Sequence, residues 1–118
     1  SRYPDGQAVL QIMYDTDPAK MSDLNVIIFR ELKSIADNGP RAEDFSKVKE
    51  YMLKQQTESL KENGYWLSIL NHKYVYGEDD YSKDSEALNS STAKDIQDFT
   101  SNLLSQGNQA TIVMMPKE

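Results

Sequence analysis

Two short apolar stretches stand near the ends of this 118-residue chain, and most of the sequence between them repeats with helical periodicity. The first, from Gln7 to Asp15, reads QAVLQIMYD, and alternation places apolar side chains on both of its faces. The second, from Gln109 to Met115, reads QATIVMM and is stopped by Pro116, which is typical of a β-strand. The order therefore predicts an α+β fold, in which a layer of three or four helices packs on a small sheet.

Start and stop signals divide the central region into helices. Asp17-Pro18 is an N-cap followed by proline at the first helical position, and Asn38-Gly39-Pro40 ends that helix. Arg41 stands where the next helix needs a capping side chain, so this second helix is expected to begin with a weak cap. Apolar residues recur at helical spacing in the first helix at Met21, Leu24, Ile28, Leu32 and Ile35.

Further signals divide the second half of the chain. Asn63-Gly64 predicts an end or a bend in the second helix, and helical spacing then resumes up to Gly77. Residues 82–89 are expected to form one or two helical turns. A firmer helix begins at Thr92, where Asp95 completes a capping-box pattern, and Gly107 ends it.

The charge pattern and the scarcity of certain residue types narrow the range of functions. A net charge of −6, with Lys and Arg interleaved among Asp and Glu, argues against a nucleic-acid partner, which requires a cationic surface. No apolar run approaches the roughly 18 residues of a membrane helix, so we expect no membrane span. With no cysteine and a single histidine, the chain is assigned no catalytic and no metal-binding residue. That histidine, His72, is expected to be a partly exposed structural residue.

The stretch from Ser59 to Gly77 holds the only tryptophan, the only histidine and three of the seven tyrosines. Aromatic rings give a large contact area at low entropic cost, so these side chains could line a peptide-binding surface. Aromatic residues at helical spacing are more often part of a core, and Trp66 is expected to be mostly buried. Both interpretations remain open for the four candidate substrate-binding residues, which are Tyr65, Trp66, Tyr74 and Tyr76.

Distributed features, rather than a catalytic signature, carry a family resemblance over nearly the whole chain. They are the helix break at Asn38-Gly39-Pro40, the helix from Lys49 to Gln56, the turn from Glu62 to Trp66 with its exit at Tyr76-Gly77-Glu78, and the Thr92 helix that runs into an apolar strand ending in Met-Pro. In these features the chain resembles the C-terminal end of the pitrilysin/insulinase family of zinc metallopeptidases.

The resemblance implies a specific place for this chain within such an enzyme. Family members have two homologous halves that close around an unfolded peptide, and the zinc and the general base belong to an inverted H-x-x-E-H motif in the first half. Neither that motif nor the substrate-contacting Arg and Tyr of the second half, which stand seven positions apart, occurs here. Residues 1–118 are therefore expected to form a single partial domain of the inactive half, cut from a longer protein.

The function implied is that of a non-catalytic part of a zinc metalloendopeptidase, which helps to form the peptide chamber opposite the zinc. The zinc would be bound by another domain, and the partners would be the N-terminal zinc-binding half and the peptide substrate. Two alternatives remain: a scaffold subunit of the same fold, and a free-standing helical interaction module. Periplasm, cell envelope and cytoplasm all stay open as locations. Because the two expected strands are too few for a stable sheet, the chain is also expected to self-associate, most simply as a two-fold homodimer.

Overall fold

The computed structural model describes residues 8–115, and within this range every regular element is a helix. The elements in chain order are the short 3-10 helix η1 (Pro18–Lys20), α1 (Met21–Asn38), α2 (Ala42–Ser59), α3 (Asn63–Tyr76), α4 (Asp80–Ser90) and α5 (Ala93–Ser105). The predicted α+β fold is therefore wrong for the described part of the chain, which is all-helical.

The two expected strands are the source of this error. Residues 8–15 and 110–115 are extended, and no main-chain hydrogen bond joins either segment to another described part of the chain. Of the two remaining residues of the expected strands, Gln109 bonds to Gly107 within the turn after α5, and Gln7 lies outside the described residues. A strand becomes regular structure only when a second strand pairs with it, and an isolated pair of strands is at best marginally stable in water. The strand-like sequence is therefore present without the pairing that would make a sheet.

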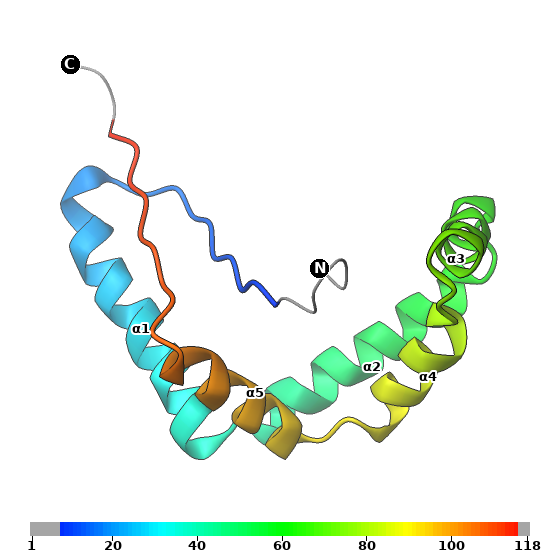
Figure 1. The fold of residues 1–118 in the computed structure, drawn as a ribbon. Helices are drawn as coiled ribbons and strands as arrows, with labels where there is room; N and C mark the ends of the chain where they lie inside the picture. Colours follow the sequence, from blue (N-terminus) through cyan, green and yellow to red (C-terminus); the bar gives the residue numbers. More distant parts are fainter. Residues whose placement is uncertain (1–7, 116–118) are drawn as a thin grey trace.

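The helices form an open, two-armed arrangement (Figure 1). One arm consists of α1 with α5 packed along it, and the other is built from α2, α3 and α4, with α4 in contact with both of the other two helices. At the junction, the Gln97 side chain on α5 donates a hydrogen bond of 2.8 Å to the Asp37 carbonyl at the end of α1. The first and last segments of the chain leave the same arm.

This arrangement exposes much more surface than a compact domain of the same size. The chain has 9983 Å² of accessible surface, whereas a compact monomer of this mass has roughly 6,500 Å². Its radius of gyration is 17.9 Å, against about 13.5 Å for a compact chain of this length. The buried residues within 8–115 are Asp80 and Thr100, each 7 % exposed, and no apolar side chain there is buried to that extent. The helices therefore form a layer whose apolar surfaces are only partly covered by the described residues.

The helix boundaries confirm most of the local signals. The Asp17 carboxylate accepts a hydrogen bond of 2.9 Å from the Ala19 amide, with Pro18 at the first helical position. Gly39 ends α1 at a φ of 79°, a conformation that glycine adopts without steric cost. Arg41 makes no capping hydrogen bond, as expected, and its guanidinium instead pairs with Asp44 at 2.6 Å.

The break in the second predicted helix lies earlier than expected. α2 ends at Ser59, and Asn63 and Gly64 form the first turn of α3 rather than the break itself. The indole N–H of Trp66 donates a hydrogen bond of 2.9 Å to the Leu60 carbonyl at the end of α2. Since the last carbonyls of a helix lack partners within the helix, this bond stabilises the turn at residues 60–62 that separates α2 from α3.

The final two helices follow their capping signals. Thr92 and Asp95 form the predicted capping box, in which the Asp95 amide donates to Thr92 Oγ1 and the Thr92 amide donates to the Asp95 carboxylate. α4 is longer than the one or two turns expected for residues 82–89, because Asp79 caps it by accepting a hydrogen bond of 3.2 Å from the Ser82 amide. The acidic loop therefore supplies the start of a helix.

Candidate functional site

The structure separates the four candidate aromatic residues instead of bringing them together on one surface. Successive residues of a helix differ by about 100° in direction, and 11 residues span about 16 Å along the axis. Tyr65 and Trp66 leave the start of α3 in different directions although their rings meet edge-on, and Tyr76 lies at the opposite end of the helix. Tyr74 is 83 % exposed, and Tyr76 stands edge-on to the His72 ring at 5.4 Å.

An aromatic cluster joins the start of α3 to the start of α4. The Trp66 ring lies 5.7 Å from the Tyr65 ring in an edge-on arrangement and 5.6 Å from the Tyr81 ring. Trp66 remains 39 % exposed, so the expectation that it is mostly buried is wrong. Such ring pairs contribute about 0.5–1.5 kcal/mol beyond the area they bury, so the cluster holds α3 and α4 together. Sequence reasoning missed Tyr81 because it placed the start of α4 too late.

Tyr65 is the member of this cluster with the most altered acidity. Partial burial raises the pKa of its phenol above the ordinary value, and the neighbouring Tyr81 and Asp84 raise it further. All three causes disfavour the phenolate. Tyr65 therefore carries a neutral hydroxyl, which can donate a hydrogen bond at the edge of the groove described next.

An apolar groove of about 650 Å³ runs between α2, α4 and the start of α5, and we call it the interhelical groove. Its volume lies within the range of small-ligand and peptide side-chain pockets, which is roughly 300–1,000 Å³. The apolar side chains that line it are Phe45, Val48, Met52, Ala87, Leu88 and Ile96, with Tyr65 beside them. The groove offers apolar contact area to whatever enters it.

Lys49, the one lysine among the described residues that line the interhelical groove, has a structural role. Its ammonium group donates hydrogen bonds of 2.8 Å to both the Asn89 and the Ser91 carbonyls at the end of α4, and it lies 5.8 Å from the centre of the Phe45 ring. A cation is favourable at the negative end of a helix, where the carbonyls lack partners. Lys49 therefore fixes the distance between α2 and α4 and so the width of the groove.

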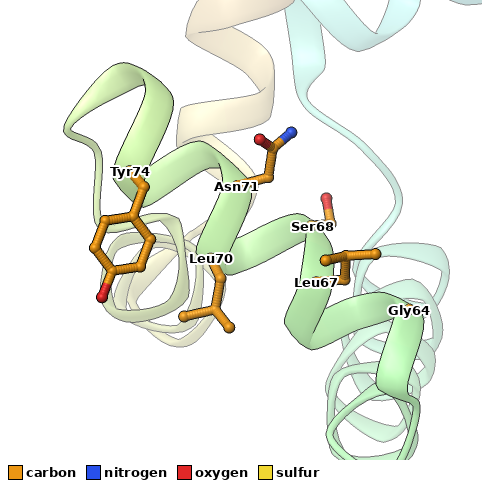
Figure 2. A pocket seen from close by; sticks show the side chains of 6 residues that line it. All are labelled: Gly64, Leu67, Ser68, Leu70, Asn71 and Tyr74. Carbon is orange, nitrogen blue, oxygen red and sulfur yellow. The ribbon is translucent and has the colours of Figure 1, made fainter.

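A second, shallower apolar surface lies on the outer face of α3 (Figure 2). Leu70 and Tyr74 project from the same side of the helix, with Leu67 one turn before Leu70. The spacing of these three residues is that of one helical face. Leu67 is 71 % exposed and Tyr74 is 83 % exposed, so this outer α3 face is open to a partner.

His72 is half-exposed, as expected, and takes part in a structural contact. Its Nδ1 atom lies 2.6 Å from a carboxylate oxygen of Asp80, which is only 7 % exposed. The pair bridges α3 and α4 across the turn in which Gly77 adopts a φ of 72°. It holds the turn closed between the two helices.

The described residues do not fit a zinc site. Within 8–115 there is no group of three or more histidine, aspartate or glutamate side chains arranged to hold a metal ion. His72 is directed at Asp80, and Asp79 caps α4. In the same part of the chain, no helix has both the length and the apolar character needed to cross a membrane.

Comparison with known proteins gives no match. No protein-family model, no curated protein and no solved structure matches this chain. The resemblance to the pitrilysin/insulinase family therefore depends on the sequence features alone.

Proposed function

We propose that this chain is a non-catalytic part of a zinc metalloendopeptidase and helps to form the chamber that holds peptide substrates opposite the zinc-binding half. The observation that carries the proposal is the open helical layer, in which no apolar side chain among residues 8–115 is fully buried. Apolar surface exposed on this scale marks a site of contact with another protein surface or a ligand. The family resemblance supplies the identity of that larger protein.

Two surfaces are suited to different contacts in such an enzyme. The interhelical groove is apolar and its width is fixed by Lys49, so it fits a protein surface that packs permanently. The outer α3 face presents Leu67, Leu70 and Tyr74 on a shallow surface, where an unfolded peptide can lie without a deep pocket. We therefore assign peptide contact to the outer α3 face.

The test uses the parent protein, with the zinc-binding half present. Tyr74→Ser in the parent enzyme should raise KM for an internally quenched peptide several-fold and leave kcat unchanged, because it removes binding that substrate and transition state share. Tyr51→Ser is the matched control, since Tyr51 is 62 % exposed on α2 and lines neither surface. Equal effects of the two substitutions would count against the outer α3 face.

The alternative is a scaffold subunit of the same fold, and the open helical layer suits it equally. Peptide hydrolysis by the parent protein, together with its reading frame, distinguishes the two functions. If the parent protein assembles with its partner and hydrolyses no peptide, and if its reading frame lacks an H-x-x-E-H motif, the scaffold function replaces the peptidase function. Assembly with metal-dependent hydrolysis would support the peptidase.

A further inference from the structure

We propose that residues 110–115 form a self-association edge, at which the same segment of a second copy pairs in antiparallel orientation across a two-fold axis. We call this segment the C-terminal edge. The proposal concerns association of this chain with itself, so it does not depend on the proposed peptidase function.

The main chain of the C-terminal edge has no partner among the described residues. Gly107 turns the chain out of α5 at a φ of 67°, and the segment then runs away from α5 (Figure 1). The last main-chain hydrogen bond found before residue 115 runs from the Gln109 amide to the Gly107 carbonyl at 3.1 Å. A row of extended, unpaired N–H and C=O groups is a template for pairing with another chain.

The side chains of the C-terminal edge show the alternation of a strand with one open face. Ile112 and Met114 are 89 % and 93 % exposed, whereas Val113 between them is 45 % exposed. Thr, Ile and Val favour extended structure because their branched side chains pack well on a pleated surface. The segment contains neither a charged residue nor a proline, which are the usual means of protecting an exposed edge.

Two features favour a second copy as the partner. Identical segments are complementary to each other under antiparallel two-fold pairing, so no separate matching surface is required. The chain carries a net charge of −6, and most contacts between two copies would therefore place like charges together. The uncharged C-terminal edge avoids that repulsion, which destabilises directly opposed pairs in a sheet.

The exposed area is also sufficient for a stable dimer. The surface of 9983 Å² exceeds that of a compact monomer by roughly 3,500 Å². An obligate homodimer buries about 1,000–2,500 Å² on each subunit. Pairing of so short a segment alone is marginal, so the apolar side chains of Ile112 and Met114, which oppose each other when the two-fold axis passes through Val113, must add to the interface.

Sedimentation velocity of the whole chain over a concentration series tests the proposal. The wild type should convert from monomer to dimer, and Val113→Pro should weaken association about tenfold or more, because it removes a main-chain donor from both copies. Met13→Pro is the matched control, since Met13 lies in the other extended segment and is 80 % exposed. It should leave association unchanged, and circular dichroism should show the same helix content in all three proteins.

A charge exchange then tests the pairing itself. Ile112→Lys and Met114→Glu should each be monomeric alone, and an equimolar mixture should form dimers, because Ile112 of one copy opposes Met114 of the other and the mixture places opposite charges there. In the wild-type dimer the amide protons of Thr111, Val113 and Met115 should be protected from hydrogen exchange, because alternate amides of a strand point toward its partner. A wild type that stays monomeric up to about millimolar concentration, disruption by Met13→Pro instead of Val113→Pro, or a mixture that stays monomeric would each overturn the proposal.

Discussion

Replacing Lys49 by methionine should separate α2 from α4 without changing the helices themselves. The substitution keeps most of the aliphatic stem and removes the ammonium group that contacts the Asn89 and Ser91 carbonyls at 2.8 Å. A hydrogen bond to a charged group contributes about 1.5–3 kcal/mol, and the low end applies here because the site is partly open to water. Ordering a lysine side chain costs roughly 1.5–2 kcal/mol, so the net loss for the two bonds should be about 1–2 kcal/mol.

The matched control for this prediction is Lys47→Met, two residues away on the same helix. Lys47 pairs with Glu43 within α2, and both side chains are highly exposed, so its loss should cost no more than about 0.5 kcal/mol. Native-state hydrogen exchange of the α4 amides measures the local opening free energy in both variants. If the two substitutions lower α4 protection equally, the bridge from Lys49 to the end of α4 does not stabilise the packing of these helices.

Two other predictions concern single contacts. Trp66→Phe should cost about 1 kcal/mol in the stability of the turn between α2 and α3, because it keeps an aromatic ring but removes the hydrogen bond to the Leu60 carbonyl. Hydrogen exchange of the amides at residues 60–66 measures this cost, and unchanged exchange would refute it. Hydrogen bonds from Thr92 lower the pKa of Asp95 below its ordinary value. The capping interaction therefore stabilises α5 fully above the unfolded pKa of about 4, and this stabilisation is lost as the pH falls through the lower folded pKa. Thr92→Ala should reduce the loss of α5 helicity that accompanies acidification. An unchanged loss of helicity at low pH would contradict the assignment.

Signals that act within one turn could be read from the sequence. Asp17-Pro18, Gly39 and the Thr92–Asp95 capping box all stand where expected, because a cap depends only on residues three or four positions away. The alternation in the first extended segment also holds, since Met13 is 80 % exposed and Ile12 beside it is 46 % exposed. Local chemistry and local periodicity were therefore sufficient for these features.

Features that depend on distant partners could not be read in this way. Strand-like residues at 110–115 do not form a strand in this structure, because pairing requires a second segment that the sequence pattern does not identify. The division of the four aromatic residues among three surroundings follows from the position of α4, whose start the sequence placed too late. The break before α3 depends on the bond from Trp66 to Leu60, which no propensity scale encodes.

The junction between α1 and α5 has a consequence for how the chain folds. The hydrogen bond from Gln97 to Asp37 joins residues 60 positions apart, whereas the contacts of α2, α3 and α4 lie within a shorter stretch. Closing a flexible loop of that length costs roughly 3–4 kcal/mol of chain entropy before any contact is gained. We therefore expect the arm of α2, α3 and α4 to form early and the docking of α5 on α1 to be the slow, final step.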